Sequence, residues 1–204
     1  MRTATCLLSA LALALPAITG CKIPRNETGN LKTAIDNYYD QRPECLWTNS
    51  VQLPQTFDED DLAHVRQFDA LASVGLVQSV PLTRMKSATV HKPAKMYDLT
   101  DKGRANWRRD PSRTGYGNFC YAHREVKQIL HNTQAGIEPG AMTHVSYSYE
   151  VGSIKDWADS DQVQEAFPWI VRTLHSTGTA DENLVLTKDG WKVQSASTKP
   201  GTTN

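Results

Sequence analysis

The side chains best suited to bind a metal or to transfer protons are widely spaced along this chain. Its six histidines are His64, His91, His123, His131, His144 and His175. The sequence has no His-Glu-x-x-His and no Cys-x-x-Cys, the spacings that bring two metal ligands together on a helix or a turn. We therefore interpret the histidines as surface or structural residues and expect neither a metal nor a cofactor.

Nucleophilic catalysis and catalysis by paired carboxylates also lack a recognisable pattern. There is no Gly-x-Ser-x-Gly and no Ser-x-x-Lys. Glu125 or Glu150 with a second carboxylate would suit a hydrolase, but acidic residues occur along the whole chain and single out no pair. We expect a protein that is not an enzyme.

Composition narrows the class of protein further. The chain has 204 residues, of which 22 are Lys or Arg and 22 are Asp or Glu. This length suggests one or two domains, and five Trp argue against disorder. A net charge of zero gives no electrostatic reason to expect nucleic acid as a partner. The most basic stretch is broken by Asp101 and Asp110 and is typical of a solvated face. It consists of Lys102, Arg104, Arg108, Arg109 and Arg113.

The N-terminus predicts export from the cytoplasm. Arg2 precedes an apolar stretch from Leu7 to Ile18. This stretch is shorter than the roughly 20 residues of a membrane span, so we interpret residues 1–20 as a cleaved signal peptide. The stretch ends in Ile18-Thr19-Gly20-Cys21.

These four residues resemble the lipobox of bacterial lipoproteins. The resemblance implies that Cys21 becomes the first residue of the mature protein, carries the lipid and anchors the protein to a membrane. Lys22 follows, where inner-membrane lipoproteins of enteric bacteria have Asp, so the resemblance implies the outer membrane. The alternative is an ordinary signal peptide that happens to be followed by Cys21.

Two cysteines then remain for a disulfide. Cys6 leaves with the signal peptide, and Cys21 carries the lipid, which leaves Cys45 and Cys120. The cell envelope is oxidising, so we expect a Cys45–Cys120 disulfide. The alternative is two buried free thiols.

The first half of the chain predicts helices around a hairpin. A lipidated tether over 21–30 leads to a helix whose apolar residues recur with helical spacing from Leu31 to Tyr39 and which Pro43 stops. A second helix follows the acidic residues 58–61, and a strand over 76–85, a polar connection over 86–95 and a return strand over 96–99 come after it. Residues 57–108 resemble a winged helix, with Leu-Thr-x-x-Gly-Arg opening the last helix. We expect a winged-helix-like domain over 31–109.

The second half, over 115–196, predicts an antiparallel sheet with a packed helix. Apolar and polar residues alternate strictly over 144–151, which indicates a half-buried strand. A helix begins near Asp159 and is broken by Pro168, and Asp189-Gly190 predicts the turn of a closing hairpin. We expect an α+β fold overall and a flexible tail over 197–204.

Two further resemblances concern longer stretches. The ending LVLTKDGWKV resembles the last hairpin of small cone-shaped or cystatin-like envelope domains. The mature chain also resembles a recurring set of uncharacterised proteobacterial lipoproteins, which implies no particular activity. The matching pieces are AIDNYYDQRPECLW, LTDKGR, NFCYAHREV, YSYEVGSIKDWA and LTKDGWKV.

The aromatic residues of the second half are the remaining functional signal. Tyr147, Tyr149 and Trp157 either belong to the core or form a face that binds a lipid, a peptide or a glycan. We predict a non-catalytic envelope module, lipid-anchored through Cys21, that binds an unknown envelope protein or a small ligand. The alternative is an envelope hydrolase or transferase acting on cell-wall, glycan or lipid material.

Overall fold

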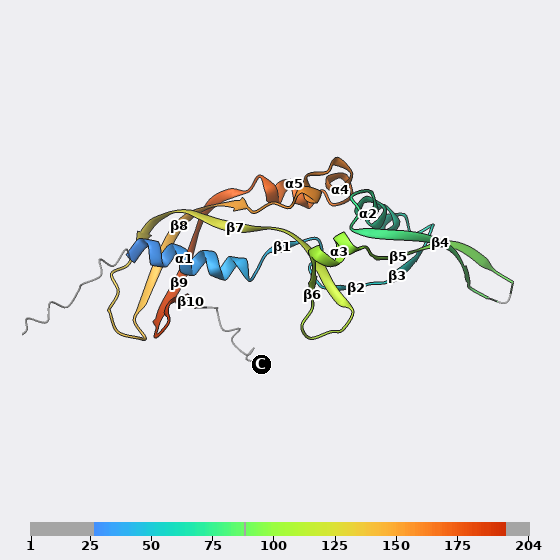
Figure 1. Ribbon diagram of the computed structural model, residues 1–204. Helices are drawn as coiled ribbons and strands as arrows, with labels where there is room; N and C mark the ends of the chain where they lie inside the picture. The colour runs from blue at the N-terminus through green and yellow to red at the C-terminus, as the bar shows by residue number, and fades with distance from the viewer. Residues whose placement is uncertain (1–26, 88, 195–204) are drawn as a thin grey trace, which may run out of the picture.

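The computed structural model describes residues 27–87 and 89–194 and has the expected mixed α+β architecture. The signal peptide, Cys21 and the tail that the sequence predicts lie outside these residues. Within the described part, the protein is elongated and is built from two antiparallel sheets and five α-helices (Figure 1). None of these helices is long and apolar enough to cross a membrane.

The larger sheet has the order β1-β7-β8-β9-β10, and β2 and β6 also pair with β7. Its strands are β1 (Glu44–Cys45), β2 (Val51–Gln52), β6 (Trp107–Arg109), β7 (Tyr116–Asn132), β8 (Met142–Gly152), β9 (Thr177–Thr187) and β10 (Gly190–Val193). The alternation predicted for β8 is confirmed at Val145, Tyr147 and Val151, which are buried. The closing hairpin predicted at Asp189-Gly190 is confirmed as β9–β10.

Helix α1 (Glu27–Asp40) packs on this sheet and buries one side of it (Figure 1). The helix contributes Leu31, Ala34 and Ile35, which confirms the apolar stripe read from the sequence. The resulting α1 core consists of these three residues with Val126, Val145, Tyr147 and Leu184. A helix expected in the first half of the chain therefore packs on the sheet of the second half.

The smaller sheet has the order β3-β5-β4 and carries the predicted helix–hairpin–helix unit. Its elements are β3 (Gln55–Asp58), α2 (Leu62–Ser73), β4 (Val77–Met85), β5 (His91–Leu99) and α3 (Asp101–Asn106). The side chain of Asp61 accepts a hydrogen bond from His64 N and caps α2, and Thr100 caps α3 through Gly103 N. Gly75 has φ +74° after α2, a conformation in which a side chain is costly.

One expectation for this unit is wrong. Residues 91–95 do not form a polar connection but begin β5, where His91 pairs with Met85 and Lys95 with Pro81. The two strands project as a hairpin from the rest of the molecule (Figure 1). Their polar side chains remain solvated, so cross-strand pairing does not require the apolar alternation that marks a half-buried strand.

Short helices of the second half cover the first half. A 3₁₀ turn η1 (Asp156–Asp159) leads to α4 (Asp161–Ala166) and α5 (Trp169–Leu174), and Pro168 separates the two helices as predicted. Helix α4 packs against α2, where Arg66 donates a 2.7 Å hydrogen bond to the carbonyl of Glu165. The α2 core includes Phe68, Leu71, Phe119, Trp157, Phe167 and Ile170. The two predicted halves thus interleave.

The predicted disulfide links Cys45 of β1 to Cys120 of β7. The two residues are partners in the β1–β7 register. Leu46 N donates a 2.9 Å hydrogen bond to the carbonyl of Phe119 directly beside the disulfide. The bond therefore attaches the segment that follows α1 to the strand that runs through both cores.

Candidate functional site: a cavity beside helix α1

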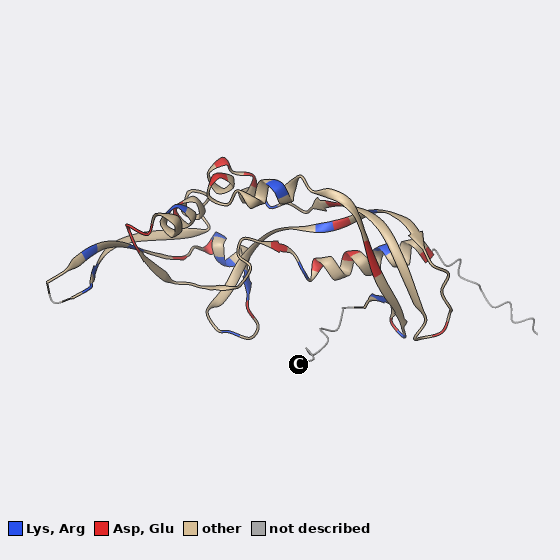
Figure 2. Ribbon diagram, turned by 180° about the vertical axis from the view of Figure 1, so that it is seen from behind, with Lys and Arg blue, Asp and Glu red and all other residues tan. Residues whose placement is uncertain are grey.

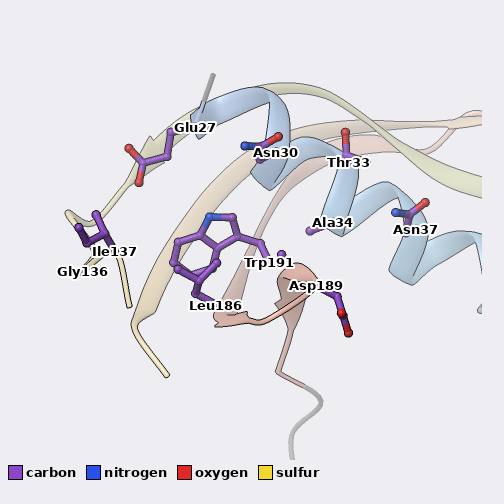
Figure 3. A pocket seen from close by; sticks show the side chains of 11 residues that line it. Glu27, Asn30, Thr33, Ala34, Asn37, Gly136, Ile137, Leu186, Asp189 and Trp191 are labelled. Carbon is purple, nitrogen blue, oxygen red and sulfur yellow. The ribbon is translucent and has the colours of Figure 1, made fainter. Parts of the chain in front are cut away.

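A cavity of about 310 Å³ opens where three elements meet: helix α1, the β9–β10 hairpin and the loop between β7 and β8 (Figure 3). We call it the α1 cavity. Its volume lies at the lower end of the range for small-ligand sites. Each of the three elements contributes a different kind of side chain.

Helix α1 supplies a polar wall. Asn30, Thr33 and Asn37 lie on one stripe of the helix, beside the buried stripe that holds it on the sheet. The Thr33 hydroxyl donates a 2.9 Å hydrogen bond to the carbonyl of Gly29. The side chains of Asn30 and Asn37 are exposed and make no hydrogen bond with other described residues. Their amides are therefore available to a ligand as donors and acceptors.

The β9–β10 hairpin supplies the apolar floor. Trp191 pairs with Leu186 across the hairpin, and Figure 3 shows the indole above the Leu186 side chain. Gly190 has φ +110° in the turn, and the Thr187 hydroxyl donates a 2.7 Å hydrogen bond to its carbonyl. This tight turn holds Trp191 in the floor of the cavity. Asp189 points away from the indole (Figure 3).

The β7–β8 loop closes the third side and is fastened to β9. Gly140 N donates to the carbonyl of Leu186 and Leu186 N donates to the carbonyl of Ala141, both at 2.8 Å. Beyond this attachment, Ile137 lies across from Trp191 with 65% of its surface exposed. An exposed aliphatic side chain at a cavity mouth is suited to contact a ligand.

The charge of the lining limits what the cavity can bind. Glu27 and Asp189 contribute carboxylates, and no Lys, Arg or His is among the lining residues. Asp189 has an ion pair with Lys192 at 3.6 Å, whereas Glu27 has none within the described residues. An indole, amides and carboxylates together suit a neutral polar or a cationic ligand and disfavour an anion.

The aromatic residues singled out in the sequence do not line this cavity. Tyr147 is fully buried in the α1 core. Tyr149 is half-buried, and the guanidinium carbon of Arg124 lies 4.8 Å from its ring centre. Trp157 is 4% exposed and belongs to the α2 core, where it packs edge-on against Phe119. The three side chains therefore form no common face.

Tyr147 instead takes part in a partly buried chain of hydrogen bonds beneath α1. The Tyr39 hydroxyl donates to Glu182 Oε1 at 3.1 Å, so the hydroxyl of Tyr147, 2.9 Å away, donates to Tyr39. Burial raises the pKa of Tyr147, and this donated hydrogen bond raises it further. Burial also raises the pKa of Tyr39. Both hydroxyls are therefore held neutral.

Two features of the sequence correspond to the α1 cavity but do not predict it. The tether was expected to extend to residue 30, but α1 begins at Glu27, so Asn30 lies within the helix. The spacing of Asn30, Thr33 and Asn37 marks a polar helix stripe, and Trp191 directly follows a predicted hairpin turn. Neither signal shows that the two meet, because 154 residues separate Asn37 from Trp191.

The histidines form no metal site in the described part of the chain, which has no group of three His, Cys, Asp or Glu residues arranged for a metal ion. His123 lies between two carboxylates, 3.2 Å from Asp40 and 3.5 Å from Glu125. The Ser153 hydroxyl donates to Glu125 and not to His123, so the cluster lacks the serine–histidine hydrogen bond of a nucleophilic triad.

No family model matches the chain, and no curated protein or solved structure is significantly similar to it.

Proposed function

We propose that this protein is a lipid-anchored module of the bacterial cell envelope that binds a small polar ligand in the α1 cavity. The observation that carries the proposal is the cavity itself, which three separate elements build around an indole, two free amides and a carboxylate. The ligand that fits this lining is neutral or cationic and has hydrogen-bonding groups on an otherwise apolar body.

The position of the proposed anchor supports this role. If Cys21 carries the lipid, only residues 21–26 separate the membrane surface from Glu27, which both begins α1 and lines the cavity. Six residues span at most about 20 Å. The cavity would therefore face ligands at or near the membrane surface, where tethering raises its effective concentration. Lys22 favours the outer membrane for this anchor.

A winged-helix-like character for residues 57–108 belongs to the same proposal. The element order α2, β4, β5, α3 and the cap at Thr100 support it. We assign this unit no nucleic-acid partner. Its α2 is capped by Asp61 and follows Asp58, Glu59 and Asp60, which would repel phosphates at the end of a recognition helix.

The anchor is tested by metabolic labelling with radioactive palmitate. We expect label on the wild-type chain, none on Cys21→Ser, and unchanged labelling of Ser87→Cys, which keeps Cys21 and adds a cysteine elsewhere. Label that remains on Cys21→Ser would overturn the anchor without affecting the ligand site.

The cavity is tested by saturation-transfer NMR on the full chain with three probes that differ in charge. We expect binding of N,N′-diacetylchitobiose, a neutral glycan, or of trilysine, a cationic peptide, and none of citrate. Trp191→Leu should abolish the signal, whereas Trp169→Leu, the same change at a half-buried Trp outside the cavity, should preserve it. Equal signals for both variants, or preferential binding of citrate, would contradict the proposed site.

A further inference from the structure

A second cavity, of about 370 Å³, lies on a different part of the molecule and has the opposite electrostatic character. It opens between α3, β6 and the hairpin that joins β6 to β7. Three arginines line it, Arg104 from α3, Arg109 from β6 and Arg113 from the hairpin. Figure 2 shows basic segments on each of these elements. We call it the arginine cavity.

The three arginines differ in how far they are already neutralised. Arg104 pairs with Asp101, and Arg113 pairs with Asp110 at 3.0 Å. Arg109 is exposed, and its side chain makes no hydrogen bond or ion pair with any other residue in the described ranges. The guanidinium of Arg109 is therefore unpaired at the cavity, and its five N–H donors are available to a ligand or to water.

Asp110, the one acid in the lining, serves to position Arg113. Its carboxylate accepts hydrogen bonds from Ser50, from the hydroxyl and the amide of Ser112, and from Arg113. These bonds hold the pKa of Asp110 well below its usual range. The guanidinium carbon of Arg113 also lies 4.4 Å from the ring centre of Tyr116. Arg113 is thus fixed in place before any ligand binds.

Strand alternation separates Arg109 from its neighbour. In β6, Trp107 and Arg109 point to one face and Arg108 to the other. Arg108 accordingly donates a 2.7 Å hydrogen bond to the carbonyl of Gln41 and does not line the arginine cavity. Gly117 faces Arg109 across the strand pair, and a Cβ there would lie 2.4 Å from the Trp107 indole. The missing side chain makes room for the indole beside Arg109.

We propose that the arginine cavity binds a small organic phosphate. Guanidinium groups from three elements around one volume match the several oxygens of a tetrahedral phosphate better than a single planar carboxylate. The remaining lining includes Leu53, Leu99, Trp107 and Tyr116, which suits the organic part of such a ligand. The site is independent of the α1 cavity and of the lipid anchor.

Isothermal titration of the full chain with sn-glycerol 3-phosphate and with glycerophosphoglycerol tests the proposal. The first is a phosphomonoester. The second is a phosphodiester, the part of phosphatidylglycerol that remains when its acyl chains are removed. Binding of the monoester alone identifies a free sugar- or glycerol-phosphate as the source, and binding of the diester identifies a lipid headgroup. In either case, we expect Arg109→Gln to weaken binding about tenfold or more, as the loss of a charge-assisted hydrogen bond would.

Arg108→Gln is the matched control, because it removes the same charge from the adjacent residue of the same strand. We expect it to change the affinity by less than about twofold, since nonspecific attraction is screened by salt at 0.15 M. Arg109→Gln removes no side-chain hydrogen bond or ion pair within the described residues, so its melting temperature should be close to that of the wild type. Failure of both phosphates to bind, or equal weakening by the two variants, would overturn the proposal.

Discussion

The hydroxyl of Tyr147 in β8 lies 2.9 Å from the hydroxyl of Tyr39 in α1 and donates its hydrogen to it. This contact joins residues that are 108 positions apart and fixes the last turn of α1 against the centre of the large sheet. Glu182 of β9 ends the chain of hydrogen bonds. None of these three residues lines the α1 cavity, so the hydrogen bonds support α1 without contributing to the cavity lining.

Substitutions at the two tyrosines of this hydrogen-bond chain should lower the free energy of unfolding by different amounts. Tyr147→Phe removes a terminal donor, and we expect a loss of about 1 kcal/mol in the free energy of unfolding. Tyr39→Phe removes the central hydroxyl and leaves the buried Tyr147 hydroxyl without an acceptor, for which we expect about 2 kcal/mol. The double variant should cost less than the sum, because the two residues share one network. Urea unfolding measures the free energy of unfolding of all three variants. Strictly additive losses would contradict a shared hydrogen-bond network.

The raised tyrosine pKa values predict a loss of stability at alkaline pH. Burial raises the pKa of Tyr39, Tyr97, Tyr121 and Tyr147 above the ordinary value near 10. Below pH 10 these groups are neutral in both states and their contribution to stability is complete. Above it they ionise first in the unfolded chain, so stability falls as pH rises toward the folded-state values.

Absorbance at 295 nm measures this ionisation directly. We expect the signal of these four tyrosines to appear together with the loss of far-ultraviolet circular dichroism between about pH 10 and 12. Tyr97→Phe should remove one of the four tyrosines from this signal. The variant also removes the 2.8 Å hydrogen bond that the Tyr97 hydroxyl donates to Asp69. Complete ionisation of all tyrosines near pH 10 in a protein that is still folded would refute the prediction.

Local patterns predicted the elements whose formation depends on neighbours in sequence. The stripe from Leu31 to Tyr39, the acidic residues before α2 and the break at Pro168 all act within one or two helical turns. Pairing with distant strands was not predictable in the same way. The start of β9, Thr177 to Asn183, is polar and pairs with β8 only because the chain returns beside it.

The two candidate sites were harder to predict than the elements, for different reasons. The α1 cavity forms where segments from three distant parts of the chain meet. The arginine cavity is lined by Leu53 and by residues between Leu99 and Tyr116, which are close in sequence. The basic stretch in it has the pattern of a solvated face, since the sequence does not reveal which of its charges are paired. The sequence left open whether Tyr147 and Trp157 belong to the core or to a binding face, because aromatic character does not distinguish a core side chain from one in a cavity.

Gly103 is predicted to be essential for the contact between α3 and the segment that links α2 to β4. A Cβ at this position would lie 1.8 Å from the carbonyl oxygen of Leu76, which is backbone and cannot move aside. We expect Gly103→Ala to lower the free energy of unfolding by about 3 kcal/mol or more. Gly136→Ala is the control, because its Cβ would meet only the Ala141 side chain at 3.4 Å. That variant should stay within about 1 kcal/mol of the wild type.

The disulfide should contribute a large share of the stability, because it closes a long loop. Cys45 and Cys120 are 75 residues apart, and in the chain-entropy model such a cross-link stabilises the folded state by roughly 4 kcal/mol. We expect the double variant Cys45→Ala/Cys120→Ala to lose this amount in urea unfolding.

Reduction provides the matched measurement on the unaltered sequence. The wild-type chain in dithiothreitol should unfold at the urea concentration of the double variant, and the double variant should not respond to dithiothreitol. Strand β1 has only two residues, and Leu46 and Trp47 directly after it pack in the α2 core. Loss of the bond should therefore also expose Trp47, which a red shift of tryptophan fluorescence before global unfolding would report. A thiol count that is the same before and after reduction of the folded protein would show that the bond is not formed.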